Sequence, residues 1–158
     1  MDISFKTEEG AFKYRVVGVL KDKKGRILIQ KVEGNSFYCL PGGRVELGES
    51  SGEAIARELK EELGFKVDII RPLFSLENFF KRPNGSLVHE NSVYFEATSD
   101  EFPEEDWELV ENDKGILKKL TYKWVTVEEF KKEDVRPDFL KEKLTNLSDN
   151  FEQIVIRE

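Results

Sequence analysis

The hydrophobic residues of the first forty positions fall into short runs separated by polar turns, a pattern that predicts β-strands. Residues 12–20 are rich in β-branched side chains, 21–25 predict a turn and 26–31 predict a second strand, so we expect a hairpin. The apolar run 37–40 predicts another strand. It ends at Pro41-Gly42-Gly43, where the backbone can turn and be approached closely.

Hydrophobic residues next recur at every fourth position, a spacing typical of an α-helix. Ser50 or Ser51 can cap this helix, and Glu53 lies three residues after Ser50, as in a capping box. Gly64 is a suitable residue for the C-terminal end. We therefore predict a loop over 43–49 and a helix to about residue 63, whose core-facing residues are Ile55, Leu59 and Leu63.

The second half of the chain predicts more strands and two short helices. We expect a strand over 66–74 and a hairpin of 76–80 with 88–97, joined through the turn pair Asn84-Gly85. Residues 98–120 begin with acidic side chains and predict an irregular surface insertion, although Trp107 and Leu109 could start a short strand there. The remaining predicted segments are a strand over 120–125, a helix over 127–132 capped by Thr126, a helix opened by Pro137 to about residue 144, and a tail over 151–156.

The tail is compatible with a last strand, a helix end or a contact in a homodimer. Antiparallel hairpins around one central helix predict the α/β class, with a sandwich built on a mixed sheet. The chain has 158 residues, the length of one domain, and we expect a single domain over 1–158.

Three glutamates of the central helix form the strongest candidate for chemistry. Glu58, Glu61 and Glu62 stand at positions i, i+3 and i+4, so they share one helix face with Cβ atoms about 5–6 Å apart. Carboxylates that crowd together repel one another unless a cation lies between them. Hard oxygen ligands of this kind suit Mg²⁺ or Mn²⁺.

The residues around these glutamates follow a pattern of fixed spacing. It runs Gly, five residues, Glu, seven residues, Arg-Glu, an apolar residue, any residue, Glu-Glu, any residue, Gly and an apolar residue. This is the Nudix box, and the chain resembles the Nudix family, because every position of the box is matched: Gly43, Glu49, Arg57, Glu58, Leu59, Glu61, Glu62, Gly64 and Phe65. The chain over about residues 12–130 resembles the rest of a Nudix domain more weakly.

The resemblance implies a Nudix-type α/β/α sandwich with a catalytic loop-helix-loop. It also implies hydrolysis of a nucleoside diphosphate linked to another group, with Mg²⁺ or Mn²⁺ as cofactor and a nucleotide-type small molecule as substrate. In this family the metal is held by the glutamates that correspond to Glu58, Glu61 and Glu62. The carbonyl of Gly43 is a further candidate ligand, and Gly42 and Gly43 are candidates for contact with substrate.

Arg57 is expected to orient a metal-binding carboxylate. It lies four residues after Glu53 and four before Glu61, and it can also reach back to Glu49, which then shapes the loop. The alternative is an ordinary solvated helix crossed by Glu–Lys pairs. The complete box favours the functional interpretation.

A general base outside the box is sought on the strand 88–97. Glu90 and Glu96 share one face by the two-residue period, but both are also compatible with solvent-facing charges, because Val93 and Phe95 make the other face the better core face. His89 lies on that opposite face and could contact phosphate, act as the base, or belong to the core or surface.

Aromatic residues offer candidates for stacking on a nucleobase. Phe79 and Phe80, with Tyr38, could do so or could fill the core. Glu77 is a weaker candidate for the base. No motif matches those associated with coenzyme A, NADH or dinucleoside polyphosphates. The proline expected after the box in ADP-ribose enzymes is not matched in place, because Pro72 lies too near and Pro83 slightly late.

The composition of the chain limits which kinds of molecule it is expected to bind. The formal charge of −7 argues against extensive binding to a nucleic-acid backbone, though not against a small phosphate substrate whose charge metal ions offset. A single cysteine, Cys39, excludes an intramolecular disulfide. No signal pattern and no run of about 18 apolar residues occurs, so we expect a cytoplasmic protein without a membrane span.

Three functions remain open at this point. The first is a pyrophosphohydrolase acting on nucleoside diphosphate derivatives or nucleoside triphosphates. The second is an enzyme that processes 5′ ends of RNA, against which the acidic charge counts. The third is a non-catalytic nucleotide-binding module, against which the intact set of three helix glutamates counts.

Overall fold

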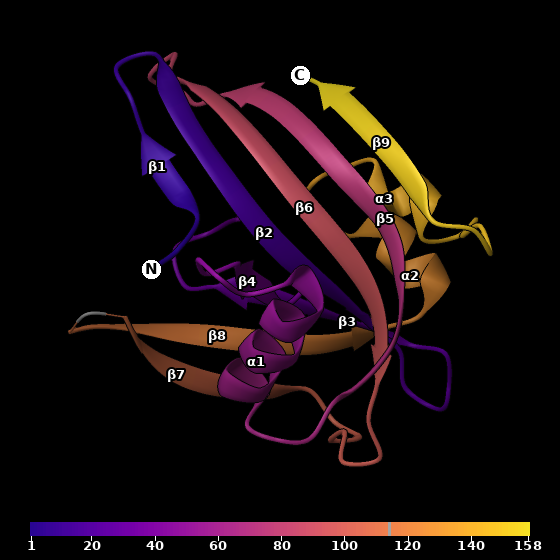
Figure 1. Ribbon diagram of the computed structural model, residues 1–158. Helices are drawn as coiled ribbons and strands as arrows, with labels where there is room; N and C mark the ends of the chain where they lie inside the picture. Colours follow the sequence, from indigo (N-terminus) through magenta and orange to yellow (C-terminus); the bar gives the residue numbers. More distant parts are fainter. Residues whose placement is uncertain (114) are drawn as a thin grey trace.

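The computed structural model describes residues 1–113 and 115–158, which form two β-sheets and three helices (Figure 1). The larger sheet has the order β1-β2-β6-β5-β9, with β4 also paired to β2. Its strands are β1 (Ser4–Lys6), β2 (Gly10–Leu20), β4 (Gly42–Arg44), β5 (Asp68–Lys81), β6 (Leu87–Thr98) and β9 (Glu152–Arg157). Because β2 runs parallel to β6, and β5 to β9, while the other pairs are antiparallel, this sheet is mixed.

The smaller sheet is antiparallel and crosses the lower part of the larger one in Figure 1. Its order is β3-β8-β7, from β3 (Ile27–Val32), β8 (Ile116–Val125) and β7 (Trp107–Asp113). Helix α1 (Ser51–Leu63) lies in front of the place where the two sheets meet, whereas α2 (Val127–Lys132) and α3 (Leu140–Lys143) lie behind the larger sheet. The predicted α/β sandwich is confirmed.

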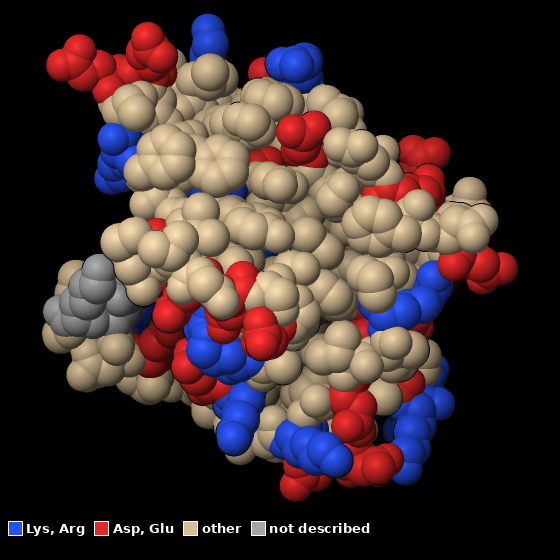
Figure 2. Space-filling model, in the orientation of Figure 1, with Lys and Arg blue, Asp and Glu red and all other residues tan. Residues whose placement is uncertain are grey.

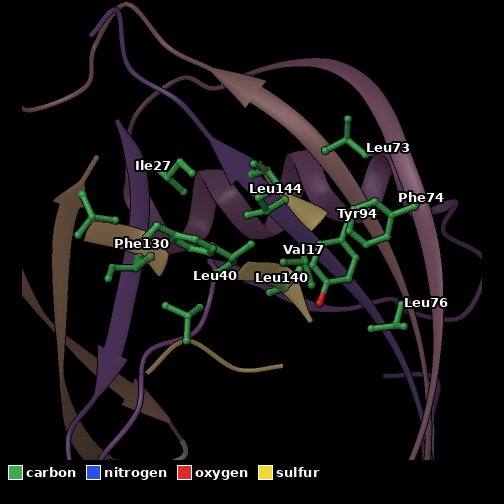
Figure 3. Packing of buried hydrophobic residues seen from close by; sticks show 14 residues of the cluster. Val17, Ile27, Leu40, Leu73, Phe74, Leu76, Tyr94, Phe130, Leu140 and Leu144 are labelled. Atoms are coloured by element: carbon green, nitrogen blue, oxygen red, sulfur yellow. The ribbon is translucent and has the colours of Figure 1, made fainter. Parts of the chain in front are cut away.

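Strand β2 divides the hydrophobic core into two clusters. Val16 and Leu20 face α1, while the alternating residues Val17 and Val19 face α2 and α3. Figure 3 shows the second cluster, in which side chains from the strands pack against Phe130, Leu140 and Leu144 from the helices or from the end of α3. Because both faces of the C-terminal half of β2 are buried, the sequence of that half is almost continuously apolar.

Helix α1 has the predicted ends. The Ser50 side chain accepts a hydrogen bond from the backbone N–H of Glu53, and the Glu53 carboxylate accepts one from the backbone N–H of Ser50, at 3.2 and 2.9 Å. Gly64 ends the helix with φ of 76°, a conformation that glycine adopts without strain. The buried face carries Ala54, Ile55, Leu59 and Leu63, so the flank with the three glutamates is left facing the smaller sheet.

The predicted hairpin of 12–20 with 26–31 is wrong. Strand β2 pairs with β6 along its whole length, and β1 and β4 pair with its other edge over residues 11–13 and 15–17, so β3 cannot pair along that edge as predicted. Only one isolated bridge, Lys21 with Ile27, joins the two segments, and β3 pairs with β8 instead.

The strand predicted over 37–40 is also wrong. Tyr38 and Cys39 form only isolated bridges, to Val135 and Gln30, and the regular strand is β4, which overlaps the start of the predicted loop. The strands expected over 66–74 and 76–80 are one strand, β5, with register shifts near Arg71 and Leu73. The hairpin with β6 is confirmed.

The segment 98–120 is more regular than predicted. Its acidic start is irregular, but β7 and the first part of β8 form a hairpin, in which the Asn112 side chain accepts a hydrogen bond from the N–H of Gly115. Helix α2 has the predicted capping box of Thr126 and Glu129, whereas α3 begins at Leu140 rather than at Pro137. The tail forms strand β9 at the sheet edge. No helix in the described part of the chain has both the length and the apolar character that a membrane crossing requires.

Candidate metal and active site

A pocket of about 180 Å³ lies between the flank of α1 and the smaller sheet. Figure 2, in the orientation of Figure 1, shows acidic and basic side chains gathered over α1, below a largely uncharged surface. Among the described residues, no Lys or Arg lines the pocket, which is bordered by Gln30, Val32, Gly42, Glu58, Glu61, Glu62, Glu111 and Leu120. The structure therefore brings the three predicted helix carboxylates into one pocket.

Arg57 ties α1 to the loop that precedes it. Its Nε and Nη2 donate to the two carboxylate oxygens of Glu49, at 2.7 and 2.9 Å, and Nη2 also donates to the carbonyl of Arg44, at 3.0 Å. Hydrogen bonding to this guanidinium holds the pKa of Glu49 at about 2. Nη1 reaches Glu58 at 2.9 Å and Glu61 at 3.4 Å, so one side chain links the loop to two carboxylates of the pocket.

The Glu58 carboxylate lies against the backbone of β4. It accepts a hydrogen bond from the N–H of Arg44, at 3.3 Å. A Cβ atom at Gly43 would lie 2.0 Å from the carboxylate carbon of Glu58, so only glycine leaves room for this arrangement. Gly42 is equally confined, because a Cβ there would lie 2.1 Å from the carbonyl oxygen of Val16.

The Glu62 carboxylate is the most enclosed of the three. The Tyr122 hydroxyl donates to one of its oxygens at 3.0 Å, and the N–H of Gly42 donates to the other at 3.3 Å. Burial raises the pKa of Glu62 to about 7, against these two hydrogen bonds, and the negative charge of Glu111 adds to the rise. The pKa of Tyr122 is raised as well, chiefly by burial and then by the charge of Glu62.

The pocket has the donor chemistry of a site for a hard divalent ion, since it is lined by carboxylate oxygens. Within residues 1–113 and 115–158, no three Asp, Glu, His or Cys side chains are already arranged so that they could hold a metal ion. The carboxylates are engaged by Arg57 and Tyr122 instead. Glu58, Glu61 and Glu62 line the pocket together, and a Cβ at Gly43 would fall on the Glu58 carboxylate, so the residues fit such an ion.

Glu90 and Glu96 lie outside this pocket. They share the face of β6 that carries Tyr94, which packs in the cluster covered by α2 and α3. Glu96 pairs with Arg71 at 3.1 Å, and Glu90 lies 4.0 Å from Arg15. Their side chains are only 23% and 15% exposed, so the alternative of solvent-facing strand charges is wrong.

His89 and Phe79 lie on the other face of the larger sheet and also outside the pocket. Their rings stack with centroids 4.3 Å apart, Phe12 meets His89 edge-on at 5.3 Å, and the Arg157 guanidinium lies 4.2 Å from the Phe79 ring centre. Phe80 follows on the opposite face and is partly buried. The structure therefore does not bring these three candidates together with the α1 glutamates.

Three residues beside the α1 glutamates were not found from the sequence. Gln30 interrupts an apolar run, which is a weak signal, and Tyr122 lies in a correctly predicted strand whose partner was unknown. Glu111 lay in the segment predicted to be irregular, so no face could be assigned to it. All three come from the smaller sheet, whose strand pairing was not predicted.

Comparisons with known proteins agree with this arrangement. A relative from Methanocaldococcus jannaschii named ADP-ribose pyrophosphatase is 48% identical over 72 residues, which are 42% of this chain and 41% of the relative. One from Haemophilus influenzae named 8-oxo-dGTP diphosphatase is 41% identical over 51 residues, or 30% and 38% of the two chains. The matched stretches thus span about two fifths of the length of these curated relatives.

Solved structures support the fold. The crystal structure of a MutT protein from Bacillus halodurans superposes with a TM-score of 0.62 at 17% identity, covering 92% of this chain and 89% of that one. The family model of the NUDIX domain matches residues 11–144, which include β4, α1 and all three strands of the smaller sheet. Because this match extends over far more than half of the sequence, the chain belongs to the Nudix family.

Proposed function

We propose that this protein is a metal-dependent Nudix hydrolase that cleaves a diphosphate linkage in a nucleoside diphosphate or triphosphate derivative and releases a nucleoside monophosphate or a similar product. The observation that carries the proposal is the pocket in which Glu58, Glu61 and Glu62 meet beside the loop of Gly42 and Gly43. Family membership supports the reaction class.

In this proposal Glu58, Glu61 and Glu62 hold Mg²⁺ or Mn²⁺, with the Gly43 carbonyl as a further candidate ligand. A bound divalent ion offsets the negative charge of the diphosphate and lowers the pKa of a coordinated water. Arg57 positions Glu58, and Tyr122 with the Gly42 N–H positions Glu62. The glycines of β4 leave room for Val16 and for the Glu58 carboxylate to lie against the backbone. Glu90, Glu96, Phe79, Phe80 and His89 are not assigned a role, because none lines this pocket.

The substrate class follows from charge and from the relatives' names. The substrates named for these relatives, ADP-ribose and an oxidised nucleoside triphosphate, both contain a diphosphate linkage. We therefore expect the substrate of this protein to be a nucleotide with a diphosphate linkage. An RNA 5′ end is the second candidate, and the formal charge of −7 disfavours it. A non-catalytic module is disfavoured because every acidic residue of the box is retained.

The test is incubation of the purified protein with Mg²⁺ and a panel of nucleoside triphosphates, oxidised triphosphates, nucleotide sugars, ADP-ribose and dinucleoside polyphosphates, with products identified by mass. We expect one class to be cleaved at a diphosphate and the cleavage to stop when the metal is chelated. Folded protein that turns over no member of the panel, or that remains active after chelation, would contradict the proposal.

Arg57→Lys tests the positioning role of the guanidinium. Lysine keeps the charge but cannot make the two-pronged contact with Glu49 while also reaching Glu58. We expect the Mg²⁺ concentration for half-maximal activity to rise about 10- to 100-fold, the usual effect of losing a residue that orients a metal ligand. Lys60→Arg, on the exposed side of α1, is the matched control. An unchanged Mg²⁺ dependence in Arg57→Lys would refute the role.

A further inference from the structure

Polar side chains gather on one face of the larger sheet, outside the metal pocket. The face is apolar where Val17, Tyr94 and Phe74 lie side by side in the cluster covered by α2 and α3 (Figure 3). Toward the N-terminal ends of β2 and β6 the same face carries five polar residues, Lys13, Arg15, Asn78, Glu90 and Ser92. All five are buried or half-buried, so this is not an ordinary solvated strand surface.

Arg15 and Glu90 form an ion pair whose capacity for hydrogen bonds is largely unused. Arg15 Nη1 lies 4.0 Å from a carboxylate oxygen of Glu90, which is beyond hydrogen-bond distance. Among the described residues, Glu90 accepts one side-chain hydrogen bond, from the Ser92 hydroxyl at 3.3 Å. A carboxylate can accept about four hydrogen bonds and a guanidinium has five N–H groups. Both groups are partly exposed and therefore have capacity left for a ligand.

This pair lies beside the metal pocket. Arg15 stands opposite Arg44 in the pairing of β2 with β4, next to the position that holds Gly43. Burial raises the pKa of the Cys39 thiol, the charge of Arg15 lowers it and the charge of Glu62 raises it, so Cys39 lies within range of both charges. A nucleotide whose phosphates lie at the α1 glutamates can therefore place its base against this face of the sheet.

The pair presents two acceptor oxygens next to a group of donors. Guanine matches this arrangement, because its N1–H and N2 amino groups are neighbouring donors and its O6 is the acceptor beside them. Adenine does not match it, since it has an acceptor at N1 and an amino group in place of O6. A phosphate group fits poorly even though Lys13 stands opposite Glu90 in β2, because the carboxylate would repel it.

We propose that Arg15 and Glu90 recognise the base of a guanine nucleotide, with Glu90 accepting from N1–H and the N2 amino group and Arg15 donating to O6. This inference rests on the proposed function and narrows its substrate class. A base without the two neighbouring donors leaves the Glu90 carboxylate unpaired as the substrate displaces water from it, and this cost makes the pair selective.

The experiment is calorimetric titration of the full chain with GMP, IMP and AMP in the presence of Mg²⁺. IMP lacks only the N2 amino group of GMP. We expect the wild type to bind GMP about tenfold or more tightly than either of the other two nucleotides. Glu90→Gln replaces one acceptor with a donor, so its Kd for GMP should rise about 10- to 100-fold while its Kd for AMP changes less than about twofold.

Glu96→Gln is the matched control. Glu96 lies on the same face of β6, where it pairs with Arg71 at 3.1 Å. The control removes the same charge and should leave the Kd for GMP within about twofold of the wild type. Circular dichroism checks that both variants are folded. If Glu90→Gln does not fold, the comparison of the three nucleotides on the wild type decides the proposal.

The outcomes separate this inference from the proposed function. A wild type that binds the three nucleotides equally, or that binds none of them at millimolar concentration, would overturn the guanine assignment, and so would a folded Glu90→Gln that behaves like Glu96→Gln. None of these results affects the hydrolase, which is tested by turnover of the nucleotide panel. Selective binding of GMP that depends on Glu90, in a protein that hydrolyses nothing in the panel, would keep the recognition site and reject the hydrolysis.

Discussion

Glu62→Gln is expected to lower kcat by about 100- to 1000-fold, the scale of losing one preorganised electrostatic group. Glutamine keeps the shape of the side chain and one oxygen, which can accept from either the Tyr122 hydroxyl or the Gly42 N–H, but it removes the charge that would hold a divalent ion. The fall in kcat is measured from steady-state rates at saturating Mg²⁺. A thermal melt checks that the variant is folded. A folded variant within about tenfold of wild-type kcat would refute the assignment of Glu62.

The same variant is expected to be more stable than the wild type when metal is absent and the pH is high. The pKa of Glu62 is about 7 in the folded protein, above its ordinary value of 4.5, because burial disfavours the charged form. The folded state therefore binds this proton more tightly than the unfolded state. Its contribution to stability is complete below about pH 4.5 and is lost as the pH rises through 7.

Because glutamine stays neutral, it does not suffer this loss. The free energy of unfolding should be similar for both proteins near pH 5 and should favour the variant by roughly 1–3 kcal/mol near pH 8. Urea unfolding in the presence of a chelator at the two pH values gives the comparison. A wild-type protein that lost no stability relative to the variant over this range would contradict the burial of a charged Glu62.

Gly43→Ala is the second substitution with a large expected effect, a loss of activity of about 100-fold or more. The new methyl group would occupy the place of the Glu58 carboxylate, which must swing away from the pocket and from the N–H of Arg44. Since the obstructing atoms belong to the end of a flexible side chain, the fold should survive. Rates and Mn²⁺ affinity should therefore fall together while the melting temperature changes little.

Gly52→Ala is the matched control for this substitution. Gly52 lies in the first turn of α1, where a Cβ would meet no atom within 4 Å, and alanine is favoured in helices. The control should keep full activity and melt at the same or a higher temperature. Near-normal activity in Gly43→Ala would show that the close contact between Gly43 and Glu58 is not needed for catalysis.

The parts of the molecule that could be predicted from the sequence are those set by local interactions. The ends of α1 depend on Ser50, Glu53 and Gly64, which are close together in the chain, and its buried face depends on a four-residue spacing. The β5–β6 hairpin was predicted because its turn carries Asn84-Gly85. The fixed spacing of the box placed Glu58, Glu61 and Glu62 on one flank for the same reason.

The parts that could not be predicted depend on pairing between distant segments. Strand β3 looked like the partner of β2, and only the occupation of both β2 edges by other strands sends it to β8. Glu111 reaches the pocket, and Tyr122 reaches the Glu62 carboxylate, through the register of the smaller sheet, which residue type does not specify. Glu90 and Glu96, the candidates for the general base, were also compatible with solvent-facing charges because the second cover of the sheet, by α2 and α3, was not apparent.

The parallel pairing of β2 with β6 also has a consequence for the order of folding. The whole segment 21–86, including α1, lies in the chain between these two strands, so a long loop must close before they can pair. The capped helix can form early from local contacts, but its glutamates acquire an opposite wall only when this closure and the pairing of β3 with β8 are complete. With the proposed metal site, ion binding would therefore come late in assembly, and the ion would stabilise the finished fold rather than guide the chain toward it.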